Sequence, residues 1–451
     1  MEKFTRRDFL KTAGIAGGGL VLSTGSLLHA QEGQLRGGKK LNVALLGVGA
    51  EGKVLLESML KLPYINFVAV CDIWRHNLKF AIAKIREFRK QKPKPYENYE
   101  DLIKEQAKNL DAVIIATPDF WHAPHTVAFL KAGVNVYCEK MMSDTVEGAK
   151  SMVRAMRESG KLLQIGHQRK SNPRYIYAHD ELLRKHDICG TIMACNGQWN
   201  RAVTKDIEAN KRIWIPEETL KKYGYKDMHQ FLNWRWFKGL GGGAISDLGA
   251  HQIDIFAWML GARPTAVMAS GNKGYYKNHD WADNVMCIFE YGKSFQGKPV
   301  QAFYQVLTTT SSGGGYYESF MGDKGTVKMS ENESITTLFR ENAVKEEEWK
   351  KLVAQGVIGA SSGVAEVKKA DARESGPLAS YGFPEKVPGY VDRKPIHSYH
   401  LENFFNAVMG KGKLTCDAAH AFESEAAVFK AREAAETGQK QYFKDSDFVV
   451  D

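Results

Sequence analysis

The sequence predicts an α/β protein that begins with a doubly wound parallel sheet and ends in an α+β domain with a mostly antiparallel sheet. Two observations support this prediction. Up to about Gly166, short apolar runs alternate with segments of helical apolar spacing, a pattern typical of βαβ units. After Gly166 the strand-like runs become longer and this alternation stops, which indicates a second domain of a different kind.

The first half of the chain contains short apolar runs of strand length with turn signals nearby. These are Leu41–Leu46, Ile65–Cys71, Ala112–Ala116, Val134–Cys138 and Leu162–Ile165. Segments with apolar residues at helical spacing lie between them, namely Val54–Leu62, Leu78–Phe88, His125–Ala132 and Val146–Ser159. We expect this domain to span residues 40–166.

The second half, residues 167–451, is predicted to be the α+β domain. Its strand-like runs are Thr191–Trp199, Thr265–Ala269, Val285–Tyr291 and Val300–Leu307. A helical run, Ala250–Leu260, follows the glycines Gly241, Gly242 and Gly243. Residues 356–394 are rich in small and charged residues and predict a surface insertion. Two amphipathic helices within residues 398–440, Ser398–Met409 and Ala418–Glu436, are expected to close the chain.

The first 35 residues differ from the rest of the chain. Arg6 and Arg7 stand before the glycine-rich, weakly apolar run from Thr12 to Leu28. Paired arginines before a short apolar region are the pattern of a twin-arginine signal, so we expect export to the periplasm or beyond. The alternative is a basic N-terminal helix with a chance arginine pair. No later run is long and apolar enough to predict a membrane span.

Charge and cysteine usage exclude several function classes. The formal net charge is +10, but the only dense basic run, residues 84–94, reads as a solvated helix end, so we expect no nucleic-acid partner. The six cysteines form no C-x-x-C pair and lie away from histidines at zinc-site spacing, so no metal site is predicted. Whether Cys189 and Cys195 form a disulfide is open at this point.

A glycine-rich turn directly follows the first predicted strand. Gly47, Gly49 and Gly52 form a G-x-G-x-x-G pattern that opens a helix, and Asp72 ends the next strand. The glycines allow a tight turn and close approach of a pyrophosphate, while the carboxylate accepts hydrogen bonds from ribose hydroxyls. This arrangement predicts a Rossmann domain that binds NAD. NADP is the alternative, because Arg75 is close enough to receive a 2′-phosphate.

Two later loops are also expected to reach the cofactor. Thr117, Pro118 and His122 follow the strand Ala112–Ala116, and at the carboxyl edge of a parallel sheet such a loop normally contacts the cofactor. Glu139 and Lys140 come directly after the strand Val134–Cys138. From the residues alone, Lys140 is either a cofactor-side group or an exposed loop lysine.

Asp247 and His251 are four residues apart at the start of a predicted helix, and would share one face of it. Histidine is suited to act as general base for an alcohol proton, and a neighbouring carboxylate can orient it or bind substrate. The alternative is that Asp247 caps the helix and His251 is a core residue with its hydrogen bonds satisfied.

Together these motifs resemble the glucose–fructose oxidoreductase, inositol dehydrogenase and MocA family, over nearly the whole mature chain. The resemblance implies that Lys140 lies beside the nicotinamide and that Asp247 and His251 are catalytic and substrate-binding. His167 and Arg169, in a segment similar to exported sugar-active members, are candidate substrate groups, and the alternative is a structural role for both. The family has a proline, often cis, where this chain has Met141. A non-proline cis bond is costly, so this turn is expected to be trans or strained.

The resemblance implies an exported oxidoreductase that transfers a hydride between a sugar, glycoside or cyclitol hydroxyl carbon and NAD. The cofactor would be tightly bound, because free nicotinamide cofactor is not expected outside the cytoplasm. Trp199, with Trp234, Trp236 and Tyr317, could offer a stacking face for a sugar or could be packing residues. Alternatives are an NAD-dependent glycoside hydrolase of the α-N-acetylgalactosaminidase kind and a non-catalytic sugar sensor or scaffold. A homo-oligomer through the C-terminal-domain sheet is also expected.

Overall fold

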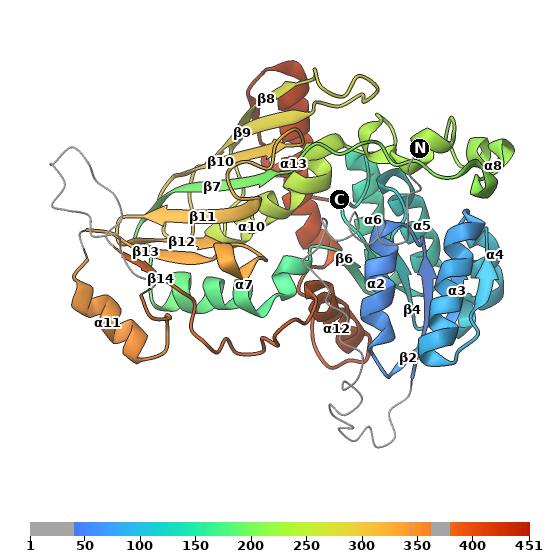
Figure 1. The fold of residues 1–451 in the computed structure, drawn as a ribbon, viewed down its shortest axis with the longest axis horizontal. Coiled ribbons are helices and arrows are strands. Elements are labelled where there is room, and N and C mark those ends of the chain that lie inside the picture. The colour runs from blue at the N-terminus through green and yellow to red at the C-terminus, as the bar shows by residue number, and fades with distance from the viewer. Residues whose placement is uncertain (1–39, 343, 362–378) are drawn as a thin grey trace, which may run out of the picture. The chain divides into compact units, whose positions relative to one another are not determined.

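A six-stranded parallel sheet forms the first part of the fold (Figure 1). Its strand order is β3-β2-β1-β4-β5-β6. The strands are β1 (Leu41–Leu46), β2 (Ile65–Cys71), β3 (Lys94–Tyr96), β4 (Ala112–Ile115), β5 (Asn135–Cys138) and β6 (Leu163–Ile165). The helices between them are α2 (Ala50–Leu60), α3 (Arg75–Arg89), α4 (Tyr99–Gln106), α5 (Asp119–Lys131) and α6 (Val146–Ser159). The strand order reverses between β1 and β4, and ligands bind at the carboxyl ends of the strands at such a point.

Alternate residues of β1 contribute to two hydrophobic cores on opposite faces of this sheet. Val43 and Leu45 pack into one cluster, and Ala44 and Leu46 pack into the other. A strand buried on both faces needs a continuous apolar run, which is why β1 was recognisable from its sequence.

The computed structural model describes residues 40–342, 344–361 and 379–451, and residues 41–451 form one unit. The predicted twin-arginine segment, including Arg6 and Arg7, lies outside the described residues. Within the described part of the chain, no helix has the length and apolar character needed to cross a bilayer.

A nine-stranded sheet forms the second part, in the order β14-β13-β12-β11-β7-β10-β9-β8-β15. Neighbouring strands are antiparallel except β7 and β10, which are parallel. The strands are β7 (Ile192–Asn200), β8 (Ala266–Asn272), β9 (Asn284–Tyr291), β10 (Val300–Leu307), β11 (Tyr316–Gly322), β12 (Gly325–Met329), β13 (Thr337–Arg340), β14 (Ala379–Tyr381) and β15 (Gln441–Tyr442). The predicted fold class is therefore confirmed. Association of copies through this sheet stays a prediction.

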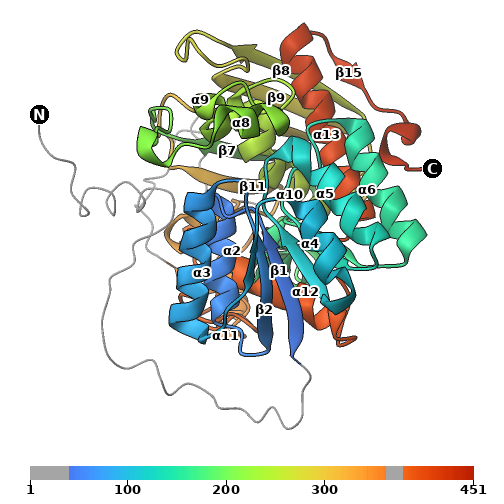
Figure 2. The same cartoon turned by 90° about the vertical axis from the view of Figure 1, so that its right-hand side faces the viewer.

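Two long helices near the C-terminus join the two sheets. α12 (Ile396–Val408) places Leu401, Phe404 and Phe405 in the core cluster that contains Val43. α13 (Ala418–Thr437) contacts β8, α6 and α10 (Ala250–Leu260), and Figure 2 shows it beside α6. The C-terminal segment thus packs against both parts of the molecule, and the predicted domain boundaries stay a prediction.

The structure bears on two further points of the sequence analysis. The predicted surface insertion, residues 356–394, contains β14, which pairs with β13 at the edge of the larger sheet. With three residues, β14 is too short to show a periodicity. Cys189 and Cys195 do not form a disulfide: both are free and buried, and the thiol of Cys189 donates a hydrogen bond to the carbonyl of Phe320.

Candidate active site

The turn between β1 and α2 is shaped to receive an anion. Gly47 has φ of +87°, and a Cβ there would lie 2.6 Å from the carbonyl oxygen of Ala116. A Cβ on Gly52 would lie 2.2 Å from the carbonyl oxygen of Gly47. A Cβ on Gly49, in contrast, would meet no atom within 4 Å. Gly49 therefore opens space in front of the α2 N-terminus, which has no side-chain cap and presents free N–H groups.

Asp72, at the carboxyl end of β2, fixes this turn. Its carboxylate accepts hydrogen bonds from the backbone N–H groups of Val48 at 2.7 Å and Trp74 at 2.7 Å. Burial raises its pKa to about 6, against the opposing effect of these hydrogen bonds and the nearby Lys53. Each carboxylate oxygen can accept more than one hydrogen bond, so Asp72 can still bind ribose hydroxyls.

Arg75, the residue that could receive a 2′-phosphate, is already paired. Its Nε lies 2.7 Å from Oε1 of Glu97, and its side chain is 76% exposed. The carboxylates of Asp72 and Glu97 both disfavour a phosphate at this position. The cofactor end of the site therefore fits a dinucleotide without a 2′-phosphate better than one with it.

The turn after β5 carries Lys140, and its peptide bond to Met141 is cis. Nδ1 of His122, on α5, donates a hydrogen bond to the carbonyl oxygen of Met141 at 2.6 Å. A buried carboxylate, Glu425 on α13, accepts the N–H of Met142 at 2.7 Å. The hydrogen bonds with His122 and Glu425 therefore fix the position of this turn. Burial, with the charge of Lys140, lowers the pKa of His122 to about 4, so its ring is neutral at pH 7.

Glu139 is buried beside this turn. It accepts a hydrogen bond from the hydroxyl of Tyr137 at 2.9 Å. Burial and the nearby carboxylate of Glu51 raise its pKa above the usual value of a glutamate. Thr117 bonds to Nδ1 of His125 at 3.1 Å, and Pro118 is the residue before the first turn of α5. These predicted cofactor residues lie at the carboxyl edge of the parallel sheet.

Lys140 points toward Asp247. Its Nζ donates a hydrogen bond to the backbone carbonyl of Asp247 and lies 3.6 Å from Oδ1 of that residue. Nε of Arg235 lies 2.9 Å from the same Oδ1. Burial would raise the pKa of Asp247, but the charges of Arg235, Lys140 and Arg201 outweigh burial and hold it well below its usual value. Asp247 is therefore an ionised carboxylate.

Asp247 lies in a π-helical turn, Ile245–Gly249, that leads into α10. Single π turns are often found at functional sites. No side-chain cap is present at the start of either segment, so the capping interpretation of Asp247 is wrong. Asp247 accepts hydrogen bonds from Arg235 and Lys140. Within the described part of the chain, Asp247 and His251 are not hydrogen-bonded to each other.

His251, in the first turn of α10, is 7% exposed, and its Nδ1 is buried without a hydrogen-bond partner. Burial first, and then the charges of Lys140 and Arg169, lower its pKa well below the usual histidine value. The ring of Trp199 lies 5.8 Å from the His251 ring, and the ring of His167 lies 6.4 Å from it. His251 is therefore a neutral imidazole between an aromatic surface and a polar cluster.

His167 and Arg169 also come close to His251, but both are engaged with carboxylates. Nε2 of His167 lies 3.2 Å from Oε1 of Glu425. Arg169 pairs with Glu318 through Nη1 and with Glu331 through Nε at 2.7 Å. Nη2 of Arg169 is buried without a partner and is the part of the group still able to donate. In the structure, therefore, His167 and Arg169 both form ion pairs or hydrogen bonds with buried or partly buried glutamates, next to the predicted site around His251.

The other aromatic candidates are engaged elsewhere. Trp236 stacks on His279 at 5.2 Å, Tyr317 lies against Lys328, and Trp234 lies against Arg235. Trp199 alone among the four contacts His251. Its ring also stacks on Tyr316 at 4.6 Å.

Three further residues belong to the site and were missed from the sequence: Asp119, Arg235 and Glu425. Asp119 is buried at the start of α5, where burial raises its pKa well above normal despite the charge of Lys140. Its place directly after Pro118 was the available signal. Nothing local marked Arg235 or Glu425, which reach the site only through the fold.

Among the described residues, no group of His, Cys, Asp and Glu side chains is arranged to hold a metal ion.

Both parts of the chain match known protein families. Residues 41–167 match the model of an oxidoreductase family with an NAD-binding Rossmann fold, and residues 218–443 match the C-terminal α/β domain of the same family. The chain belongs to the Gfo/Idh/MocA oxidoreductase family. Its Rossmann domain is thus an NAD-binding domain.

Relatives include a glycosyl hydrolase family 109 protein of Parabacteroides distasonis, 33% identical over 36% of this chain and 37% of that protein. An α-N-acetylgalactosaminidase of Tannerella forsythia is 32% identical over 36% of this chain and 38% of that enzyme. These matches span little more than a third of the relatives' lengths. The WlbA dehydrogenase of Bordetella pertussis, solved with NADH and UDP-GlcNAcA, has the same fold, with a TM-score of 0.61, 18% identity and coverage of 90% of this chain and 99% of that one.

Proposed function

We propose that the protein is an exported, NAD-dependent enzyme that oxidises a hydroxyl-bearing carbon of a sugar, glycoside or cyclitol. The observation that supports this most directly is the convergence of Lys140, Asp247 and His251 at the carboxyl edge of an NAD-binding sheet. A non-catalytic sensor or scaffold would not need an ammonium, an ionised carboxylate and a neutral imidazole placed together.

Bound NAD would supply the hydride acceptor, and the open space at Gly49 with the free N–H groups of α2 fits its pyrophosphate. Lys140 would donate a hydrogen bond to the substrate hydroxyl oxygen and stabilise the negative charge that develops there. His251, neutral in the structure, would accept the hydroxyl proton. Negative charge that develops on the substrate oxygen would partly cancel the positive charge of Lys140. The charge of Lys140 otherwise lowers the pKa of His251 and makes it a weaker base. Asp247 would bind a neighbouring hydroxyl.

A second candidate function is glycoside hydrolysis through a transient oxidation at the same site. The resemblance to the glycosyl hydrolase family 109 protein and the α-N-acetylgalactosaminidase favours it. In this case oxidation would be followed by elimination of the aglycone and addition of water, and the hydride would then return to the sugar, so that NAD would be regenerated in each cycle. The same residues would hold the hydroxyl and move its proton.

One experiment separates the two functions. Folded, purified protein is examined by native mass spectrometry for bound cofactor and its redox state, and is then given a panel of free sugars, cyclitols and aryl glycosides. Net oxidation yields a keto-sugar and bound NADH, whereas hydrolysis yields aglycone and unchanged NAD. Absence of both products and of any change in cofactor redox state across the panel would count against an enzyme and favour the sensor.

The geometry around Asp72 and Arg75 leads to a prediction about the cofactor. Apo-protein titrated with each cofactor should bind NAD(H) at least about tenfold more tightly than NADP(H), because the two carboxylates beside Arg75 repel a 2′-phosphate. Calorimetric titration measures both affinities. Equal or tighter binding of NADP(H) would show that Arg75 leaves Glu97 to bind the phosphate.

The leader supports a further proposal, that the protein crosses the membrane by the twin-arginine route with its cofactor already bound. Replacing Arg6 and Arg7 by lysine should keep the precursor in the cytoplasm, because the paired guanidinium groups are the transport signal. Cell fractionation and immunoblotting measure this. Unchanged export of the double variant would mean that these arginines are not the signal.

A further inference from the structure

Glu425 is a buried carboxylate far from the active-site motifs in sequence, and it connects two of them. It lies on α13 with an exposed fraction of 0%. Its Oε2 accepts the N–H of Met142, two residues after Lys140, and its Oε1 lies 3.2 Å from Nε2 of His167. The His167 ring is in turn 6.4 Å from that of His251. One side chain thus joins the Lys140 turn and the residue beside His251.

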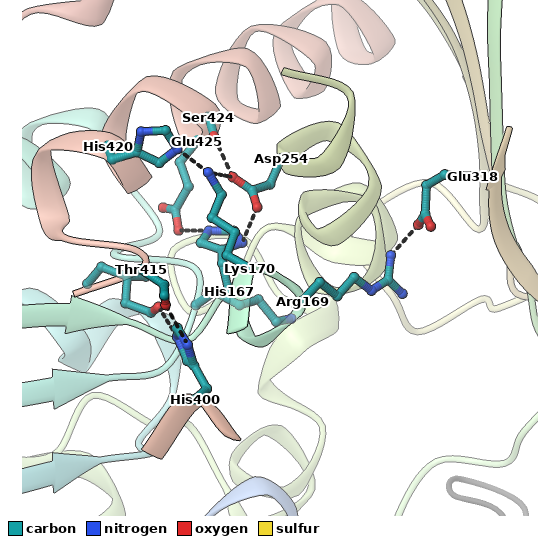
Figure 3. A network of polar contacts seen from close by, with 12 residues as sticks. His167, Arg169, Lys170, Asp254, Glu318, His400, Thr415, His420, Ser424 and Glu425 are labelled. Carbon is teal, nitrogen blue, oxygen red and sulfur yellow. Dashed lines mark hydrogen bonds and ion pairs between the residues drawn. The ribbon is translucent and has the colours of Figure 1, made fainter. Parts of the chain in front are cut away.

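A polar network holds the Glu425–His167 pair, as Figure 3 shows. Nδ1 of His167 lies 3.9 Å from Oδ2 of Asp254, whose Oδ1 accepts a hydrogen bond from Ser424 at 2.7 Å. Nζ of Lys170 lies 3.3 Å from the same Oδ1 and also contacts His420. Each member is fixed by at least one neighbour, so the position of Glu425 is strongly determined.

We propose that Glu425, with His167, is a positioning residue that fixes Lys140 for the reaction, from a helix outside the cofactor-binding domain. The inference rests on the proposed function. Among the described residues, the Met142 N–H is the only backbone group of the Lys140 turn that donates a hydrogen bond to this carboxylate. Removal of the carboxylate would leave that N–H buried and unpaired, and the turn would then shift to find another partner.

A neutral acceptor would hold the Met142 N–H less firmly than the Glu425 carboxylate, because hydrogen bonds to a charged acceptor are about twice as strong as neutral ones. Burial raises the pKa of Glu425, and the hydrogen bond and charge of His167, the N–H of Met142 and the charge of Lys140 oppose that rise. His167 supplies the hydrogen bond to the other carboxylate oxygen. Other charged or titratable groups of the surrounding elements include Asp119 on α5, Lys170, Asp247 in the π-helical turn, His251 and Asp254 on α10, and His420 and Arg432 on α13.

The test variant is Glu425→Gln, which keeps the side-chain length and removes the charge. Its matched control is Glu423→Gln, on the same helix, where the carboxylate is partly exposed and pairs with Arg263. We expect Glu425→Gln to lower kcat about 10- to 100-fold with less than a threefold change in KM. Loss of the negative charge should also move the limbs of the pH–rate profile to lower pH, because it disfavours the protonated forms of nearby bases. A residue with only a structural role would not move that profile.

A second measurement does not depend on turnover. Reductive methylation of Lys140, followed by mass spectrometry, reports whether its ammonium is held against Asp247 or released. We expect methylation of Lys140 to be several-fold faster in Glu425→Gln than in the wild type and in Glu423→Gln. If the wild type transforms no sugar, the proposed function fails, while this measurement still decides whether Glu425 positions Lys140.

If Glu425→Gln does not fold, His167→Gln takes its place, because it removes the second partner of Glu425 and leaves the carboxylate bonded to Met142. We then expect the same change of kcat, pH profile and methylation rate, to a smaller extent. A folded Glu425→Gln or His167→Gln protein with wild-type kcat, pH profile and Lys140 methylation rate would overturn the proposal.

Discussion

Replacing Lys140 by methionine should lower turnover by about 10²–10⁴-fold, the usual contribution of a positioned group that binds the reacting oxygen. Methionine keeps a similar length and apolar stem but removes the ammonium that contacts Asp247. We expect little change in NAD affinity, because Lys140 is not part of the glycine turn at residues 47–52 that faces the pyrophosphate. Steady-state kinetics on the substrate found in the sugar panel measures the effect.

The control for this change is Lys131→Met, at the exposed C-terminal end of α5. It should leave turnover within about twofold, because surface substitutions away from special features have small effects. Circular dichroism and NAD titration must show that both variants are folded. Near-normal turnover of a folded Lys140→Met protein would remove Lys140 from the reaction, and the contact between Lys140 and Asp247 would then be structural only.

The elements predicted most accurately are those with a strong local pattern. β1, β2, β10, α6 and α10 have the bounds that periodicity gave, because each buries a regular apolar run. β3 contains only three residues, including a proline, and β14 is equally short, so neither has enough length for a period. The helices α2 and α5 begin four to six residues earlier than predicted, where the glycine turn and the Thr117-Pro118 turn start them without an apolar signal.

The candidate site residues differ in how far the sequence could predict them. Asp72 was recognisable because it ends a strand after a glycine-rich turn, whereas Lys140 and Asp247 were chosen over their alternatives only through the family resemblance. Glu425 could not be found, because the partner of its carboxylate is 283 residues away and α13 has no apolar stripe that separates it from its neighbours. Arg235 lies only 12 residues from its partner Asp247, but no motif marked it. Local periodicity places an element but does not say which distant element covers it.

Replacing His251 by alanine is the second change for which we expect a loss of about 10²–10⁴-fold in turnover, because it removes the group that accepts the substrate proton. The sign of the pH effect follows from the pKa of His251, which burial lowers well below 6.5. The basic, neutral form is therefore already present below pH 6.5. In the wild type, the acidic limb of kcat/KM that reports His251 should lie below pH 6.5, and activity should fall only as the pH drops past it.

The alanine variant should lose that acidic limb together with its turnover, whereas His251→Gln, which keeps a polar group of similar size, should restore folding but not the proton acceptor. Rates measured from pH 4.5 to 9 test both points, and NAD titration checks that the cofactor domain is intact. If a folded His251→Ala protein kept near-normal turnover, the proton would have to leave through Lys140, since Arg235 and Lys140 hold the pKa of Asp247 low and make its carboxylate a weak base. Near-normal turnover of both single variants would leave no base at the site, and the reaction would have to occur elsewhere.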